Sequence, residues 1–213
     1  MSPLRRRPQP PYKLLSLLLQ DPSDELLAAR PALQEAIEVL PASTGREALR
    51  RFFARFGQAP AIELQQEYVE TFDLERRCSL YLTFFTEGDT RKRGMALLRL
   101  KRWYAAAGLP MEGPELPDYL PLMLEFAALA PDGQGRRLLA EHRPGLELLR
   151  IGLRERGSRY LDLVEAACAD LPRPGAADIE KLRRLAADGP PVEEVGLQPF
   201  APPEVVPSGE ARR

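Results

Sequence analysis

Histidine, cysteine and tryptophan are scarce in this chain of 213 residues, which contains one histidine, two cysteines and one tryptophan. Two cysteines cannot form a disulfide scaffold or a four-cysteine zinc site. A single bridge between Cys78 and Cys168 stays open, but a reduced cytosolic protein is the plainer interpretation. Adding His142 gives three potential metal ligands that lie far apart in the sequence, so we predict no metal site.

Apolar runs are short. No stretch approaches the roughly 20 apolar residues of a membrane-spanning helix, so we predict no stable membrane insertion. Three arginines at residues 5–7 precede an apolar run at residues 14–19, as they would in a secretory signal. That run ends at Gln20, Asp21 and Pro22 without a small-residue cleavage site, so we reject a signal peptide and predict a cytoplasmic location.

Net charge is small, at −1, so the chain as a whole has no attraction to nucleic acid or anionic lipid. Four basic side chains nevertheless share one face of a predicted helix. A solvated or ion-paired face is the plainer interpretation. A nucleic-acid-binding helical regulator that uses this face is the alternative, and its binding would depend steeply on salt. The four residues are Arg91, Lys92, Arg99 and Arg102.

Catalytic motifs are missing as well. The Gly-Asp-Thr sequence at residues 88–90 lacks the remaining spacing of a phosphate-binding loop and fits a turn followed by a helix N-cap. Nucleophilic catalysis needs a base beside the nucleophile. A small hydrolase that uses Cys78 or Ser79 with His142 is a third hypothesis, although His142 fits better as a solvated surface residue. We predict that the chain is not an enzyme.

Helical periodicity dominates the sequence, which is rich in Leu, Ala, Glu and Arg, so we predict an all-α fold. Pro, Gly and Asp residues mark the helix ends. No linker is long enough to separate two domains, so we predict one helical domain at residues 12–187. Residues 188–213, rich in proline and acid, are predicted to be a disordered tail. The predicted helices cover residues 12–20, 23–40 with an interruption at Pro31, 46–56, 61–73, 90–107, 118–130, 136–156 with a break at Pro144, 158–171 and 178–187.

Two of these helices have informative faces. Residues 118–130 are apolar nearly all round, and Glu125 is their only charge after the first residue, which predicts a central helix. Glu63, Glu67 and Glu70 form an acidic strip on an earlier helix. Basic groups should face this strip, because neighbouring carboxylates on a helix repel one another.

Arginine and aromatic residues gather in the middle of the chain. Arg93 falls on the apolar side of the helix predicted at residues 90–107, where a guanidinium group needs a carboxylate or carbonyl partner. The aromatic run at residues 81–85 fits core packing and a binding wall equally well. Large aromatics and arginines dominate binding surfaces, so we expect this region to hold another protein.

Four motifs carry a resemblance to a known family: YVETFD at residues 68–73, RCSLYLT at 77–83, GDTRKRG at 88–94 and ELPDYLP at 115–121. In these motifs the chain resembles the NarJ-type delta subunits, which are nitrate reductase molybdenum cofactor assembly chaperones. The resemblance extends over residues 12–171.

The resemblance implies an all-helical fold of the TorD-like kind. It also implies a cytoplasmic chaperone that binds the apo catalytic (alpha) subunit of a respiratory nitrate reductase, chiefly through its N-terminal peptide. Such a chaperone supports molybdenum cofactor insertion before membrane attachment, with cofactor-delivery proteins as further candidate partners. It needs no metal or cofactor of its own. Some relatives have histidine where this chain has Tyr119, so the resemblance supports packing or hydrogen bonding there, but no role for an imidazole.

We predict that the client peptide lies as an amphipathic helix in an apolar groove. Apolar side chains would line the groove, and carboxylates would meet basic residues of the client. Arginines would pair with Asp118, Glu125 or client carboxylates. The predicted client-binding residues are Glu67, Tyr68, Glu70, Phe72, Asp73, Arg76, Arg77, Tyr81, Arg93, Leu116, Asp118, Tyr119 and Glu125.

Overall fold

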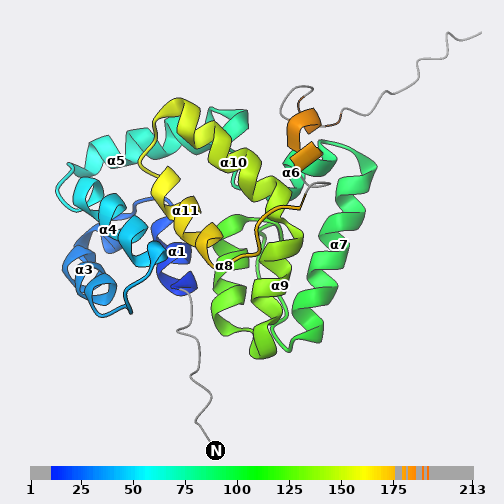
Figure 1. Ribbon diagram of the computed structural model, residues 1–213, viewed down its shortest axis with the longest axis horizontal. Helices are drawn as coiled ribbons and strands as arrows, with labels where there is room; N and C mark the ends of the chain where they lie inside the picture. The colour runs from blue at the N-terminus through cyan, green and yellow to red at the C-terminus, as the bar shows by residue number, and fades with distance from the viewer. Residues whose placement is uncertain (1–10, 176–178, 181, 186–188, 190, 192–213) are drawn as a thin grey trace, which may run out of the picture.

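The computed structural model describes residues 11–175, 179, 180, 182–185, 189 and 191. In this part of the chain the fold is all-helical, as predicted, with no β-strand. A π-helical turn (Val69–Asp73) follows α5, and short 3₁₀ turns occupy Arg76–Cys78 and Pro131–Gly133. The α-helices are α1 (Tyr12–Leu18), α2 (Asp24–Ala28), α3 (Arg30–Glu38), α4 (Thr44–Phe56), α5 (Ala61–Tyr68), α6 (Leu82–Glu87), α7 (Arg91–Ala106), α8 (Leu120–Leu129), α9 (Gln134–Glu141), α10 (Arg143–Arg156) and α11 (Leu161–Ala169) (Figure 1).

Proline and serine decide where the N-terminal helices begin. The helix predicted at residues 23–40 is interrupted as expected, because Pro31 lies in the first turn of α3, where its missing N–H costs no hydrogen bond. Ser23 and Ser43 cap α2 and α4, each accepting a backbone N–H through Oγ, at 3.3 and 3.1 Å. The cap at Ser43 starts α4 at Thr44, slightly earlier than predicted.

Helix α8 is central, as its apolar sequence predicts. Leu120, Met123 and Leu124 are fully buried, and the helix packs against α1 and α9. In Figure 1 α8 lies in the middle of the molecule, with α3, α4 and α5 on one side and α6 and α7 on the other. Its single charge, Glu125, pairs with Lys13 of α1.

Aromatic rings form the other half of the core. Phe52 and Phe56 of α4 stack with ring centroids 5.0 Å apart, and Tyr160, just before α11, packs on Phe52 at 5.6 Å. Tyr160 also meets Phe72 edge-on at 4.8 Å. These contacts join α4, the turn after α5 and α11, so helices from both ends of the described chain share one core.

The predictions for the C-terminal end fall largely outside the described residues. Of the helix predicted at residues 178–187, residues 179, 180 and 182–185 are described and helical. The tail predicted at residues 188–213 lies outside them, except for Gly189 and Pro191. None of the described helices combines the length and apolar character needed to cross a membrane.

Helices α8 and α9 cross closely at Gly135, where an added Cβ would lie 2.1 Å from the Cα of Ala127. We predict that Gly135→Ala lowers the free energy of unfolding by about 1–3 kcal/mol, because the two helices must move apart. Gly94→Ala in α7 is the matched control: its Cβ would meet nothing within 4 Å, so the change should raise the free energy of unfolding by about 0.5–1 kcal/mol. Urea denaturation measures both, and equal effects at the two positions would contradict the close crossing.

Candidate functional site

Two of the four motifs pair with each other in the fold. Tyr81 and Tyr119 form an isolated antiparallel bridge. Backbone hydrogen bonds of 3.0 and 2.8 Å join residues 80–82 to residues 118–120. The bridge fixes the segment before α6 against the segment before α8, so residues that are distant in the sequence meet at one place.

A buried carboxylate lies directly behind this bridge. Asp118 has no exposed area, and its Oδ2 accepts hydrogen bonds from the backbone N–H and the hydroxyl of Thr83. Arg93 lies 3.5 Å from the same oxygen and 3.3 Å from Asp89. The prediction that Arg93 needs a carboxylate partner is therefore confirmed. Asp118 is enclosed within the protein, which corrects its predicted role as a client contact.

A chain of tyrosine side chains leads from the core to the surface. The Tyr68 hydroxyl donates to the carbonyl of Leu19 at 3.3 Å and lies 3.3 Å from the hydroxyl of Tyr119. The Tyr119 and Tyr81 rings lie 5.4 Å apart, and the Tyr81 hydroxyl donates to Glu115 at 3.1 Å. Burial raises the pKa of Tyr68, and burial together with Glu115 raises the pKa of Tyr81 to about 12, so both stay protonated at neutral pH.

Tyr68 and Phe72 belong to the core, which corrects their predicted role as direct client contacts. Their exposed fractions are 7% and 9%. The Phe72 ring packs on Tyr68 at 4.9 Å and on Tyr160 at 4.8 Å. The four-residue spacing that places them on one face with Leu64 predicts a buried face, because such a face packs onto the rest of the fold. Tyr68 reaches the surface only through its bond to Tyr119.

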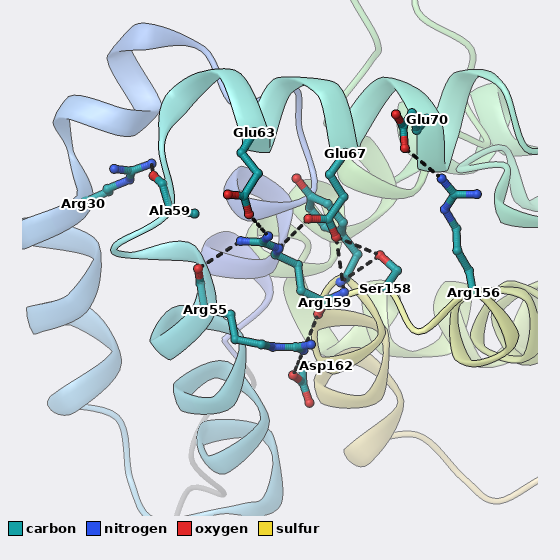
Figure 2. Close-up of polar contacts among 11 residues, drawn as sticks. Arg30, Arg55, Ala59, Glu63, Glu67, Glu70, Arg156, Ser158, Arg159 and Asp162 are labelled. Carbon is teal, nitrogen blue, oxygen red and sulfur yellow. Dashed lines mark hydrogen bonds and ion pairs between the residues drawn. The ribbon is translucent and has the colours of Figure 1, made fainter.

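Basic residues face the acidic strip on α5 and the π-helical turn after it, as predicted, and they belong to this chain. Figure 2 shows Arg159 between the strip and α4, with Nη2 2.7 Å from Glu63 and Nε 2.6 Å from Glu67. Arg156 lies 3.3 Å from Glu70. These ion pairs engage Glu67 and Glu70 within the fold, so a basic client residue would compete with Arg159 and Arg156 for them, and their predicted role in meeting the client stays a prediction.

Arg76 and Arg77 pair with other carboxylates of this chain. Arg76 lies 3.3 Å from Asp89, and Arg77 lies 2.8 Å from Glu155 of α10. Neither pairs with Asp118 or Glu125, two of the partners predicted for them, and pairing with client carboxylates stays a prediction. No local pattern signals these choices, because many exposed carboxylates compete for an exposed arginine.

A smaller set of side chains lies at the surface around the tyrosine pair. Tyr81 is the only partly exposed member of the aromatic run at residues 81–85. Burial raises the pKa of Tyr119, and the negative charges of Glu115, Asp73 and Asp21 add to this effect. Neither Glu115 nor Asp73 forms an ion pair with a described residue. Glu115 was not among the predicted contacts, although it begins the ELPDYLP motif. We call this set the tyrosine–acid surface: Asp73, Tyr81, Glu115, Leu116 and Tyr119.

Cys78 and His142 give the hydrolase hypothesis no support. Cys78 is fully buried, and burial raises the pKa of its thiol to about 11. His142 is half-buried, with Nδ1 2.9 Å from the carbonyl of Leu138, and burial lowers its pKa. This corrects the prediction of a solvated histidine. Both cysteines are free, and the described residues hold no group of three or more potential metal ligands.

The basic face of α7 is exposed, as the nucleic-acid alternative requires. Met95 and Leu98 are also exposed on this helix and interrupt the row of charges. A phosphate backbone gains nothing from these apolar side chains, so the face fits a nucleic acid poorly. The basic residues are Arg91, Lys92, Arg99 and Arg102.

The sequence matches the family model of the nitrate reductase delta subunit over residues 28–165, more than half of the chain. The chain belongs to the nitrate reductase delta subunit family. The matched span contains the four motifs and the whole tyrosine–acid surface. The residues that carry the resemblance are therefore also the ones that meet in the fold.

Three curated relatives are about one third identical to this chain. NarJ of Bacillus subtilis (strain 168) is 34% identical over 167 residues, which are 78% of this chain and 91% of that protein. NarJ of Escherichia coli K12, a nitrate reductase molybdenum cofactor assembly chaperone, is 34% identical over 155 residues, 71% of this chain and 65% of that protein. The nitrate reductase-like protein NarX of Mycobacterium tuberculosis H37Rv is 35% identical over 157 residues, and the match spans 74% of this chain but only 24% of NarX.

A crystal structure from Archaeoglobus fulgidus, assigned to the redox enzyme maturation proteins, has a similar fold. Its TM-score is 0.53 at 26% identity, covering 73% of this chain and 88% of that one. The all-helical fold expected from the resemblance is thus confirmed. Members of this family are assembly chaperones rather than catalysts, which also confirms that the chain is not an enzyme.

Arg159 should matter more to stability than its neighbour Arg156. The Arg159 side chain is 12% exposed and pairs with two glutamates, whereas Arg156 is 34% exposed and pairs with one. We predict that Arg159→Met lowers the free energy of unfolding by about 1–3 kcal/mol, because it leaves the half-buried Glu67 without its partner. Arg156→Met should cost at most about 1 kcal/mol. Chemical denaturation compares the two, and an equal or larger loss in Arg156→Met would contradict the assignment.

The two buried thiols should react slowly. Burial raises the pKa of Cys78 and of Cys168 to about 11, so at pH 8 only about one thiol in a thousand is ionised. We predict that iodoacetamide labels the folded protein far more slowly than the urea-unfolded protein, as measured by mass spectrometry. Rapid labelling of Cys78 that disappears in His142→Ala would revive the hydrolase hypothesis.

Proposed function

We propose that this chain is a cytoplasmic chaperone of the apo catalytic subunit of a respiratory nitrate reductase. It binds that subunit chiefly through its N-terminal peptide and keeps it competent for molybdenum cofactor insertion before membrane attachment. The observation that supports this proposal is the 34% identity to NarJ of Bacillus subtilis over 78% of the chain. The cofactor is cargo for the client, and cofactor-delivery proteins are further candidate partners.

The tyrosine–acid surface contains four of the predicted client contacts, Asp73, Tyr81, Leu116 and Tyr119, together with Glu115. Tyr81 and Tyr119 lie side by side, with ring planes inclined by 36°, and both are partly exposed. Leu116 is exposed next to them. An amphipathic client helix can place its apolar side on these three residues. Asp73 and Glu115, which have no cationic partner among the described residues, attract basic residues of the client and fix its orientation.

The strength of binding depends on whether the client peptide is already helical before it binds. A peptide that becomes helical only when it binds loses part of the interaction free energy to ordering. We therefore expect a micromolar-to-nanomolar dissociation constant rather than a picomolar one. A chaperone that must release its client needs an affinity in this range.

The proposed surface is tested by titrating a synthetic N-terminal peptide of a nitrate reductase catalytic subunit into the chain by calorimetry. We predict that Asp73→Asn/Glu115→Gln weakens binding about tenfold at low salt, and less at high salt, because the lost charges no longer attract basic residues. The side-chain amide introduced at position 115 can still accept the hydrogen bond from Tyr81, so the ring pair keeps its support.

Glu25→Gln/Glu35→Gln is the matched control, because it removes two exposed carboxylates from α2 and α3. Its affinity for the peptide should equal that of the unmodified chain. Absence of any binding heat for the unmodified chain would refute peptide recognition, whereas equal weakening in both double variants would refute only this surface. Glu67 and Glu70 are poor test positions, because changing them breaks ion pairs with Arg159 and Arg156.

A further inference from the structure

The outward side of α7 carries a row of exposed side chains with two apolar members in its middle. Met95 and Leu98 are 60% and 48% exposed, and an exposed arginine lies at either end of the row. The opposite side of the helix packs into the core through Leu100. Figure 1 shows α7 at the edge of the molecule, on the opposite side from α3. At about 100° per residue, the row forms one narrow stripe, which we call the α7 stripe: Arg91, Met95, Leu98 and Arg102.

Basic residues continue on both flanks of the α7 stripe, and the helix contains no acidic residue. Lys92 lies on one flank and Lys101 on the other, about 180° apart around the helix. Both are exposed, as is Arg102. None of these three cations forms an ion pair with a described residue. The outward side of α7 therefore surrounds a small apolar centre with positive charge.

Neighbouring acids offset one cation of α7. Arg99 lines a cavity of about 320 Å³ together with Glu87 of α6 and Glu141 of α9. These two carboxylates reduce the attraction of Arg99 for an external anion. The positive charge of the outward side therefore rests on the three cations without a partner in the described chain, and not on Arg99.

An anionic lipid surface matches this arrangement. Apolar side chains among lysines and arginines enter the headgroup region of a bilayer, while the long basic side chains reach the lipid phosphates. A flat array of headgroups meets both flanks of the stripe at once, whereas an acidic helix lying along it would reach only one flank. The net charge of −1 does not oppose this contact, because salt screens charges more than about 8 Å away.

We propose that the outward side of α7 is a peripheral binding surface for membranes that contain anionic phospholipids. The helix lies in the plane of the membrane, with Met95 and Leu98 among the headgroups and the three unpaired cations at the phosphates. The contact is peripheral, since none of the described helices is long and apolar enough to cross a bilayer. The surface shares no residue with the tyrosine–acid surface, so it does not depend on the proposed function.

Binding of this kind is sensitive to charge and to apolar contact. Each lysine or arginine near an anionic membrane strengthens binding by about fivefold. Lys92→Gln/Lys101→Gln/Arg102→Gln should therefore weaken binding on the order of a hundredfold. Met95→Ser/Leu98→Ser should weaken it about tenfold, because less apolar area enters the lipid. Co-sedimentation measures both, with vesicles of equal parts phosphatidylglycerol and phosphatidylcholine at low salt. Vesicles of phosphatidylcholine alone should retain little of the unmodified chain.

Matched controls remove the same kinds of side chain elsewhere. Lys13→Gln/Arg77→Gln/Arg154→Gln makes the same change of net charge at exposed residues outside α7. Val39→Ser/Ile62→Ser removes two apolar side chains that are 76% and 62% exposed. Both variants should bind the anionic vesicles as the unmodified chain does.

A fluorescent label at the stripe reports contact with lipid directly. Both natural cysteines are buried, so a cysteine introduced by Leu98→Cys can be labelled selectively with a polarity-sensitive fluorophore. Its emission should shift to the blue when anionic vesicles are added. The same label introduced by Val39→Cys should show no shift.

Absence of binding to the anionic vesicles would overturn the proposal, as would equal losses in the α7 variants and their matched controls. Vesicle binding without a blue shift at Leu98→Cys would contradict insertion of the stripe and would also overturn it. If vesicles leave this label unchanged and an acidic amphipathic peptide shifts its emission, the face binds an acidic protein helix, and the membrane proposal is wrong.

Discussion

The site depends on the buried carboxylate of Asp118. A charge without exposed area is costly unless hydrogen bonds and an opposite charge compensate for it. Thr83 at the start of α6 and Arg93 in the first turns of α7 supply both through a single oxygen, Oδ2, while Oδ1 has no partner among the described residues. Loss of either partner would leave the charge largely uncompensated. The segment before α8 is therefore held against the α6–α7 corner, and the bridge between Tyr81 and Tyr119 follows from this arrangement.

The other carboxylates of the site fall into two groups: those that pair with an arginine of this chain and those that do not. Glu63 and Glu67 share Arg159, which joins α5 to the segment before α11. Such groups stabilise the fold, and using them for a client would first require breaking an internal ion pair. Asp73 and Glu115 have no cationic partner among the described residues and incur no such cost. Unpaired charge, rather than charge content, is thus the better guide to a binding surface.

Local features of the fold were predictable from the sequence, and pairings across it were not. Pro31 and the serine caps act within one turn, so periodicity located most helices to within a few residues, whereas the short helix α6 was not predicted. The apolar side of the helix at residues 90–107 showed that Arg93 needed a carboxylate, and Asp118 provides it. The partners of Arg77 and Arg159 lie on distant segments, and exposed charges have many possible partners, so no local pattern selects one.

The error over Tyr68 and Phe72 has a different cause. Both belong to a motif that identifies the family, and the motif was interpreted as a contact surface. Their four-residue spacing places them on one helical face with Leu64, and the structure buries that face. The family motif includes these two rings because they pack in the core and support the site from there. Periodicity alone predicts a helical binding protein, whereas the chaperone function comes from the resemblance and the relatives.

The hydrogen bonds beneath the tyrosine–acid surface affect how, in the proposed function, the chaperone releases its client. Tyr119 is held by Tyr68, whose hydroxyl is fixed to the carbonyl of Leu19, and Tyr81 is held by Glu115. These side chains are thus already ordered, so in the proposed function the client peptide carries most of the ordering cost. In the proposed function, a client that folds its N-terminal segment elsewhere after cofactor loading no longer offers a peptide to bind. Release then requires a change in the client alone, since the surface itself has nothing to rearrange.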